Sequence, residues 1–259
     1  MEKIIAIILA AGKGTRMGNK EGSEIPKVMF PVAGKPIIDY AVEAVKYAGI
    51  KKIYLIVGYK KEMIEDYFKD EVEYIVQRKQ LGTGHAVMCA KNILQNQAEA
   101  ILVFYGDHSL YKAETIRKLI TLYQNPPAGG EQPTIAILSV IFQNPLHWAY
   151  GRIIRNPQGE VIGIIEQKDC NAAQLKIKES NPGFYIFNAK WLWENCLKLQ
   201  NQNTQKEFYL TDMIGIANAQ KKRILALPVS EEFEAYGINT PEQLKEAEKI
   251  LKNSPAKRI

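Results

Sequence analysis

Apolar runs alternate along the first half of the chain with segments whose apolar positions recur at helical spacing. The runs are rich in Ile, Val and Tyr and predict buried strands, at residues 3–9, 52–57, 72–76, 100–105 and 134–140. The helical pattern lies between them, at 36–48, 84–94 and 114–123. Strands that alternate with helices connect by right-handed crossovers, so the pattern predicts an α/β three-layer sandwich with a mostly parallel central sheet.

The second half has a different pattern. Residues 151–167 contain two apolar runs around Asn-Pro-Gln-Gly, which predicts a hairpin rather than a crossover. Helical spacing and a further apolar run continue the pattern, with helices expected at 172–178, 189–199 and 208–219 and a strand at 223–229. Thr240 followed by Pro241 is a helix-start signal for a last helix, and residues 125–133 read as a surface loop.

Composition narrows the class of protein. The chain has 259 residues, 46% of them hydrophobic, with a net charge of +6, which suits anionic small molecules. The basic residues are interleaved with acidic ones, so we expect no nucleic-acid partner. No apolar run approaches the roughly 20 residues that a membrane span requires, so we expect no membrane partner. Cys89, Cys170 and Cys196 are far apart in the sequence, which favours a reducing compartment and a cytoplasmic protein.

Distinctive polar residues follow three of the predicted strands at the points where they end. Gly12, Gly14 and Arg16 follow the first strand, Gln77 and the stretch QLGTG follow the third, and Gly106-Asp107 follow the fourth. Ligands of open α/β sheets bind outside the carboxyl ends of the strands. The sequence therefore predicts that these three segments converge on one rim of the sheet.

The stretch LAAGKGTRMG, directly after the first strand, resembles a phosphate-binding loop but fits neither common pattern. A Walker A loop needs Gly before its Lys-Ser/Thr, and here Gly14 follows Lys13. A dinucleotide loop needs a third glycine where Met17 stands, and Gly18 comes one place late. What remains is a Gly-rich turn whose N–H groups can face phosphates, or a plain strand-to-helix turn with solvated basic residues.

Eight segments taken in order resemble the sugar-nucleotidyltransferase (nucleoside-triphosphate transferase) superfamily. Within it they are most similar to the uridylyltransferase domains of N-acetylglucosamine-1-phosphate uridylyltransferases. The segments are LAAGKGTRM, PKVMFPVAGKPIIDY, QLGTGHAV, YGD, YGRIIRN, GIIEQKD, NPG and GIN. The resemblance implies the Rossmann-like nucleotide-diphospho-sugar transferase fold. It implies one nucleotidyltransferase domain at 1–252, with a nucleotide-binding half at 1–140, a sugar-phosphate-binding half at 141–239, and a short tail at 253–259.

The resemblance also implies a reaction and roles for individual residues. UTP and a sugar 1-phosphate, foremost N-acetylglucosamine 1-phosphate, would react with the help of Mg²⁺ to give a UDP-sugar and pyrophosphate. Arg16 and Lys27 would stabilise the transferring phosphate, and Asp107 and Asn239 would hold Mg²⁺. The nucleotide would meet Leu9, Ala10, Ala11, Gly12, Gly14, Lys27, Gln77, Gly82 and Thr83, with Gln77 and the GTG backbone at the uracil. The sugar phosphate would meet Tyr105, Gly106, Gly151, Glu166 and Asn181.

The chain departs from the family pattern in four places. It has no hexapeptide repeats of the acetyltransferase domain, so acetyl transfer and trimer formation are not expected, and the oligomeric state is left open. GDHSL stands where the family has Gly-Asp-x-Pro-Leu, NPG replaces Asn-Thr-Gly, and the segment 16–27 is longer than usual. The last three departures fall at the mouth and sugar side of the predicted site, so they bear on the sugar more than on the reaction.

Each singled-out residue also has a plainer interpretation. Asp107 and Asn239 fit a turn or a helix cap, and Glu166 fits a surface acid. His85 reads as a packing or helix-surface histidine, and His108 as a weak metal-ligand candidate beside Asp107. Other functions stay open as well. They are transfer from dTTP or CTP, another sugar or alcohol phosphate, and a non-catalytic nucleotide-binding regulator.

Overall fold

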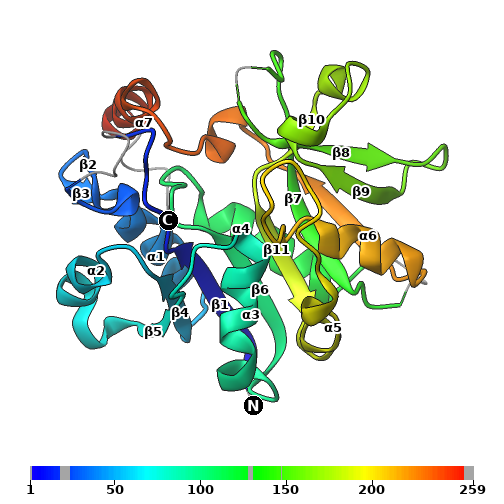
Figure 1. Ribbon diagram of the computed structural model, residues 1–259, viewed down its shortest axis with the longest axis horizontal. Helices are drawn as coiled ribbons and strands as arrows, with labels where there is room; N and C mark the ends of the chain where they lie inside the picture. The colour runs from blue at the N-terminus through cyan, green and yellow to red at the C-terminus, as the bar shows by residue number, and fades with distance from the viewer. Residues whose placement is uncertain (1, 18–23, 128–130, 147, 254–259) are drawn as a thin grey trace.

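One mixed sheet runs through the molecule, with helices on both of its faces (Figure 1). The computed structural model describes residues 2–17, 24–127, 131–146 and 148–253, and within them the sheet has ten strands. Nine follow the order β5-β4-β1-β6-β11-β7-β10-β8-β9, and β12 pairs with β7. The predicted α/β class with its Rossmann-like architecture is confirmed.

The first half of the sheet is parallel. Its strands are β1 (Glu2–Ala10), β4 (Ile53–Val57), β5 (Glu73–Val76) and β6 (Ala98–Tyr105). The pairing register sets Leu9 opposite Tyr105 and Ala10 opposite Val57, which in turn pairs with Val76. All four strands therefore end at one edge, and the residues that follow them start from a common rim.

Helices cover both faces because the central strands are apolar on both sides, as in buried parallel sheets. Ile5 and Ile7 pack in one cluster with the apolar side of α3 (Thr83–Leu94), α5 (Ala189–Asn195) and α6 (Asp212–Ala219). Ala6 and Ile8 pack in the other, with α1 (Ile37–Tyr47), α2 (Lys61–Phe68) and α4 (Ala113–Gln124). The result is the expected three-layer arrangement.

The second half of the sheet is built mainly from antiparallel pairs. Strand β11 (Phe184–Asn188) lies antiparallel between β6 and β7 (Ile135–Ile141), and β12 (Ile224–Pro228) runs parallel to β7. Beyond β7, a short strand and a hairpin complete the sheet: β10 (Glu179–Asn181), β8 (Gly151–Arg155) and β9 (Val161–Ile165). Strand β11 comes late in the chain but pairs with β6, so residues 184–188 lie beside the parallel half of the sheet.

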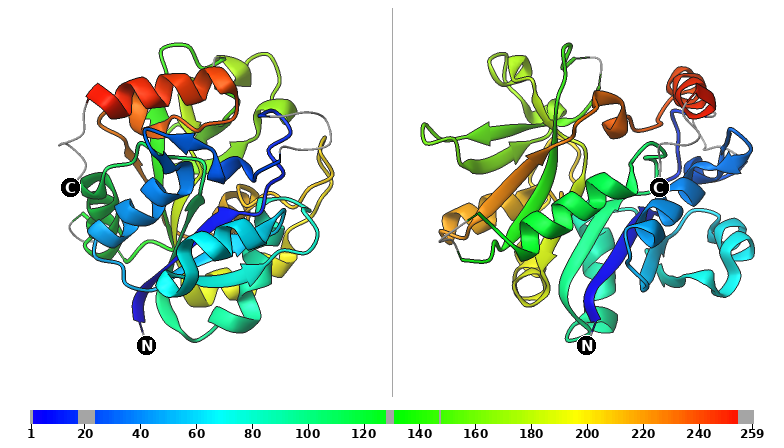
Figure 2. Two further views of the ribbon diagram at one scale, coloured as in Figure 1. Left: turned by 90° about the vertical axis from the view of Figure 1, so that its left-hand side faces the viewer. Right: turned by 180° about the vertical axis from the view of Figure 1, so that it is seen from behind.

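A third packed region, above the rim, joins the ribbon of residues 31–36 to the last helix of the chain (Figure 2). The ribbon β2 (Pro31–Val32) and β3 (Lys35–Pro36) packs against α7 (Pro241–Asn253) through Val32, Ala247 and Leu251. Six 3₁₀ turns complete the described elements: η1 (Lys27–Met29), η2 (Lys69–Glu71), η3 (Gln167–Asp169), η4 (Gln174–Lys176), η5 (Cys196–Lys198) and η6 (Glu232–Ala235). This packing brings the segment before α7 over the end of β6.

Most elements expected from the pattern exist, with ends that differ by one or two residues. The five expected strands, the three helices of the first half, the hairpin and the last helix are all present. The expected helix at 172–178 is wrong: the segment makes only the 3₁₀ turn η4, with Ile177 N–H donating to Gln174 O, because the backbone is already extended at Ile177 (φ −64, ψ 124) as it leads into β10. The strand expected at 223–229 is present as β12, and the pattern missed α2, β10, β11 and the short strands β2 and β3.

Two expected helices are shorter than the pattern suggested. The helix expected at 189–199 is α only to Asn195 and continues as η5. The helix expected at 208–219 begins at Asp212, because the backbone of Phe208 is already bonded to other segments: its N–H donates to Leu81 O, and its carbonyl accepts from Gly84 N–H. Tertiary hydrogen bonds thus keep residues 207–210 extended.

Parts of three predictions lie outside the described residues: the middle of the loop at 125–133, residues 18–23 of the long segment 16–27, and nearly all of the tail at 253–259. Within the described ranges, no helix has both the length and the apolar character that crossing a membrane requires.

Candidate functional site

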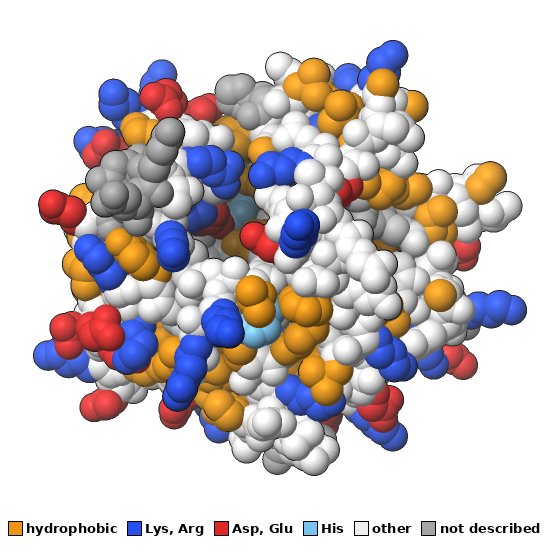
Figure 3. Space-filling view, viewed as in Figure 1, with side chains coloured by type: hydrophobic (Ala, Val, Ile, Leu, Met, Phe, Trp, Pro, Cys, Tyr) orange, Lys and Arg blue, Asp and Glu red, His pale blue; other side chains and the backbone are white. Residues whose placement is uncertain are grey.

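A cavity of about 350 Å³ opens at the rim of the sheet. Figure 3 shows a hollow on this face with Lys and Arg side chains around it and acidic and His atoms inside it. All but two of the predicted site residues line the cavity. They are Leu9, Ala10, Ala11, Gly12, Arg16, Lys27, Gln77, Gly82, Thr83, Tyr105, Asp107, Gly151, Glu166, Asn181 and Asn239. The convergence of the three strand ends is therefore observed, whereas the role of each residue stays a prediction.

Gly14 and Gly106 are the two predicted site residues that do not line the cavity. Gly14 has φ +66, and a Cβ there would lie 2.6 Å from Lys27 Cβ, so the glycine lets the loop pass against Lys27. Gly106 N–H donates to Leu9 O at 2.9 Å, and its Cα packs against β1. Gly14 therefore helps to position Lys27, and Gly106 fixes the chain just before Asp107; whether either contacts a ligand stays a prediction.

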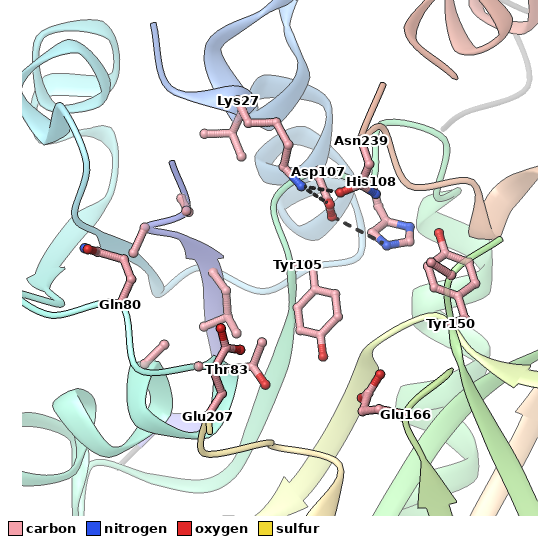
Figure 4. Close-up of a pocket in the computed structure, with 18 of the residues that line it drawn as sticks. Lys27, Gln80, Thr83, Tyr105, Asp107, His108, Tyr150, Glu166, Glu207 and Asn239 are labelled. Carbon is pink, nitrogen blue, oxygen red and sulfur yellow. Dashed lines mark hydrogen bonds and ion pairs between the residues drawn. The ribbon is translucent and has the colours of Figure 1, made fainter. Parts of the chain in front are cut away.

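Three polar groups from distant parts of the chain meet inside the cavity (Figure 4). Lys27 Nζ lies 2.5 Å from Asp107 Oδ2 and donates to Asn239 Oδ1 at 2.9 Å. Arg16 Nη2 donates to the same Asn239 oxygen at 2.8 Å. The Lys27 contacts span 80 and 212 positions of sequence, so only the tertiary fold brings these groups together.

The carboxyl of Asp107 is ionised at neutral pH in this setting. Burial raises its pKa, but the charge and hydrogen bond of the Lys27 ammonium, together with smaller contributions from His108 and a backbone hydrogen bond, hold the pKa below its usual 3.8. One carboxylate oxygen, Oδ1, is buried without a hydrogen-bond partner among the described residues. A buried acceptor of this kind is costly unless something occupies it, which fits a cation held together with substrate.

The oxygen donors suit Mg²⁺, which prefers one or two protein oxygens together with phosphate and water ligands. A carboxylate oxygen of Asp107 and the amide oxygen of Asn239 both accept from the Lys27 ammonium. The two oxygens therefore lie around one position that a cation occupies. Within the described part of the chain no group of three or more His, Cys, Asp or Glu residues is arranged to hold a metal by itself. A metal here would therefore depend on phosphate oxygens to complete its coordination.

His108 belongs to an aromatic stack beneath this cluster. Its ring is 1% exposed and stacks on Tyr111 and Tyr150, with centroids 5.2 and 6.1 Å away. Burial lowers its pKa to about 4; Asp107 opposes this shift and Lys27 adds to it. The ring is therefore neutral at pH 7, with Nε2 3.6 Å from Asp107 Oδ1.

Tyr150 holds the segment that carries Asn239. Its hydroxyl accepts from Gly237 N–H at 2.7 Å and donates to Ala235 O at 2.8 Å. One residue further on, Ile238 N–H donates to Asp107 O at 2.9 Å. These bonds connect the two predicted metal-binding segments. Tyr150 lies in the YGRIIRN segment of the sequence, yet its contacts depend on a residue far along the chain.

The side of the cavity that is predicted to meet the nucleotide lies at the start of α3. Gly82 has φ +106, and a Cβ there would lie 2.6 Å from Phe208 O. Residues 207–210, which we call the strap, run across this turn: Phe208 bonds to Leu81 and Gly84 through its backbone, and Leu210 N–H donates to Thr83 Oγ1 at 3.0 Å. The glycines of the GTG stretch therefore permit close packing of the strap.

Glu166 and Asn181 line the opposite side of the cavity. Glu166 Oε1 accepts from Thr211 Oγ1 at 3.0 Å, and Asn181 Nδ2 donates to the Tyr185 hydroxyl at 2.7 Å. Burial raises the pKa of Glu166 to about 7; the Thr211 bond lowers it in part, and Asp212 raises it further. The carboxyl is thus half-protonated near neutral pH and can both donate and accept a hydrogen bond.

The glycine of the NPG stretch, which the family pattern Asn-Thr-Gly shares, has a structural role, whereas nothing in the structure explains Pro182. Gly183 has φ +82, and a Cβ there would lie 2.1 Å from the Tyr105 ring. The glycine therefore lets Tyr105 lie over this turn on its way to the cavity.

Several lining residues were not predicted: Val28, Gln80, Ala86, His108, Ala149, Tyr150 and Glu207. All but Glu207 lie within three positions of a predicted residue in the sequence, so the motifs contained a signal for them. Glu207 is different, because it reaches the cavity only through the strap.

Comparison with known proteins defines the class. The family model described as "Nucleotidyl transferase" matches residues 5–233, and the chain belongs to this family. The resemblance read from the sequence is thereby confirmed at the family level.

Individual relatives sharpen this result. The chain is 43% identical over 249 residues to "Bifunctional protein GlmU" of Clostridium kluyveri (strain NBRC 12016), covering 96% of this chain and 52% of the relative. It is 38% identical over 258 residues to the protein of the same name from Acetivibrio thermocellus, covering 100% of this chain and 54% of the relative. The chain spans about half the length of these curated relatives.

A solved structure confirms the fold. The crystal structure of a UDP-glucose pyrophosphorylase complexed with UDP-glucose superposes with a TM-score of 0.79 over 98% of this chain and 99% of its own, at 22% identity.

Proposed function

We propose that the chain is a Mg²⁺-dependent nucleotidyltransferase domain that joins UTP to a sugar 1-phosphate, with N-acetylglucosamine 1-phosphate as the foremost acceptor. The products are the UDP-sugar and pyrophosphate. Family membership, the similarity to GlmU proteins and the ordered motifs support this function. The observation that carries it is the meeting of Lys27, Asp107 and Asn239 in one cavity.

The proposed chemistry needs cationic charge more than a base. A phosphate oxygen of the sugar 1-phosphate forms a bond to the α-phosphorus of UTP, while the bond from that phosphorus to the pyrophosphate oxygen breaks. The second pKa of a phosphate monoester is about 6, so the attacking oxygen is already ionised near pH 7. Catalysis then consists of positioning two anions and stabilising the charge that develops between them.

The residues divide this work between them. Lys27 and Arg16 are the cations within reach of the transferring phosphate, and Asp107 and Asn239 are the oxygens that would hold Mg²⁺. The metal supplies charge neutralisation for the phosphates and a template for their orientation. We assign Glu166 and Asn181 to the sugar, and Gln77, Gly82 and Thr83 to the nucleotide base; that all of them line the cavity supports this assignment.

A matrix of nucleotides against sugar 1-phosphates, read by pyrophosphate release with Mg²⁺ present, tests the proposal. We expect turnover with UTP and N-acetylglucosamine 1-phosphate, and slower turnover with dTTP, CTP or glucose 1-phosphate. Tight UTP binding without pyrophosphate release in any combination would replace the enzyme with a nucleotide-binding regulator.

A further inference from the structure

The amide of Gln77 is held at one end by two acceptors. Its nitrogen Nε2 lies 3.0 Å from the carbonyl oxygen of Gly82 and 3.0 Å from Nδ1 of His85. Gln77 is 4% exposed and lines the cavity at the carboxyl end of β5. His85 lies in the first turn of α3, three residues after Gly82.

Simple chemistry settles which atoms donate. A backbone carbonyl can only accept, so the end of the Gln77 side chain that faces Gly82 must be the NH₂ group. Its second hydrogen is directed at His85 Nδ1, which must then be the unprotonated ring nitrogen. Both hydrogens are committed, so the group left to meet a ligand is the oxygen Oε1, an acceptor.

The surroundings of His85 support this assignment. Burial lowers the pKa of the imidazole below its usual 6.5, so the ring is neutral at pH 7 and has one acceptor nitrogen. The Phe208 ring lies 6.4 Å away at an angle of 32°. Phe208 is itself fixed by backbone bonds to Leu81 and Gly84, so the strap holds one side of the imidazole.

We infer that His85 is a positioning residue for base selection: it holds the Gln77 amide with its oxygen toward the nucleotide, which favours uracil over cytosine. The inference rests on the proposed function, because it takes the nucleotide base to meet Gln77. Uracil presents a donor at N3–H, which the Gln77 oxygen accepts. Cytosine presents an unprotonated N3, which faces that oxygen with a second acceptor and leaves both unpaired.

A flipped amide would reverse this preference. If Gln77 presented its NH₂ group to the ligand, cytosine N3 would accept from it and uracil N3–H would oppose it. Gly82 O resists the flip with one bond, and His85 adds the second. Removal of the His85 acceptor should therefore weaken base selectivity while the reacting phosphates stay where they are.

The test compares two substitutions at one position. His85→Leu removes the acceptor, and His85→Asn keeps an acceptor oxygen near the place of Nδ1. The readout is the ratio of kcat/KM for UTP to kcat/KM for CTP. We expect the ratio to fall by about tenfold in His85→Leu, the factor that one hydrogen bond of ordinary strength represents. In His85→Asn it should stay within about threefold of the wild-type ratio, and kcat with UTP should change little in both variants.

A substrate analogue tests the same contact without changing the protein. The nucleotide 3-methyl-UTP carries no N3–H, so the wild type should use it at least as poorly as CTP. This measurement tests the contact between the Gln77 oxygen and N3–H even if His85→Leu unfolds, which its thermal unfolding midpoint will reveal. In that case His85→Asn tests the role of His85, because a large fall of its UTP to CTP ratio would contradict an acceptor role.

Three results would overturn the role of His85. One is an unchanged UTP to CTP ratio in His85→Leu, and another is a parallel loss with both nucleotides, which marks a merely structural residue. The third is a wild type that does not distinguish UTP, CTP and 3-methyl-UTP. Absence of turnover in the wild type would instead count against the proposed function, and the ratio of UTP to CTP dissociation constants, measured by calorimetry, would then test His85 separately.

Discussion

The two sides of the cavity are built in different ways. On one side, candidate residues directly follow parallel strands: Gln77 N–H donates to Val57 O and Gly106 N–H to Leu9 O, so both strand ends are bonded to their neighbours. On the other, which is predicted to meet the sugar, Glu166 and Asn181 come from an antiparallel extension, and Glu166 accepts a hydrogen bond from Thr211 of a separate segment. The strap at 207–210 then joins the two sides.

This difference shows where activity and stability should separate. Parallel strand ends present charged groups on a rim that the sheet itself supports, so a change of charge there should mainly affect catalysis. The sugar side and the strap rely on close backbone contacts and buried polar groups, so changes there should affect stability as well. Four substitutions, from the largest expected effect to the smallest, test the distinction.

Asp107→Asn should give the largest loss. It removes the carboxylate that we propose holds Mg²⁺ and leaves the Lys27 ammonium without its ionic partner. We expect kcat/KM to fall by about 10²-fold or more, measured by pyrophosphate release at saturating Mg²⁺. Asp66→Asn, the same substitution at an exposed position of α2, is the matched control and should be neutral. Comparable activity in the two variants would remove Asp107 from the site.

Gly82→Ala should disrupt the packing of the strap, which connects the two sides of the cavity. The new Cβ would lie 2.6 Å from Phe208 O at φ +106, so the strap must move. We expect a loss of about 3 kcal/mol in the free energy of unfolding, measured by urea denaturation. Gly49→Ala is the control, because Gly49 has φ +93 with nothing within 4 Å of its Cβ and should cost only about 1 kcal/mol. Equal losses would show that the strap contact adds nothing to backbone strain.

Glu166→Gln should change how stability depends on pH. The pKa of Glu166 is raised from 4.5 to about 7 in the folded protein, so its charged form is disfavoured and the fold is destabilised increasingly from about pH 4.5 up to about pH 7. The substitution removes this penalty. Its stabilising effect should therefore grow by on the order of 2 kcal/mol between about pH 5.5 and about pH 8.5.

Urea denaturation of wild type and Glu166→Gln at both pH values measures this effect. Glu160→Gln, at an exposed position in the β8–β9 hairpin, serves as the control. A stabilising effect that stays constant with pH would mean that Glu166 titrates at its ordinary value.

Tyr150→Phe should have the smallest effect. It removes the hydroxyl that accepts from Gly237 N–H and donates to Ala235 O. We expect a loss of about 1–2 kcal/mol in the free energy of unfolding and a severalfold rise in the Mg²⁺ concentration for half-maximal activity. Tyr47→Phe, at a side chain that is 51% exposed, is the control. An unchanged Mg²⁺ requirement would show that the Tyr150 hydroxyl does not position the segment that carries Asn239.

The sequence by itself determined the α/β class, the parallel strands and the rim on which three motifs meet. Apolar runs bounded by glycine-rich turns have few alternatives to buried strands, and the carboxyl ends of parallel strands share one edge. It also predicted Lys27, Asp107 and Asn239 as partners through the resemblance of their motifs.

Only the tertiary structure decided the rest. Helical spacing at 208–219 extends through the strap, but the hydrogen-bonding groups of Phe208 are bonded to residues more than a hundred positions away, so that segment stays extended. The same applies to Gly106, which packs against β1, and to His85, whose acceptor meets Gln77 across a turn. The local sequence pattern shows which residues are apolar and which are polar. The hydrogen-bond partner of each polar group depends on which distant segments the tertiary fold places beside it.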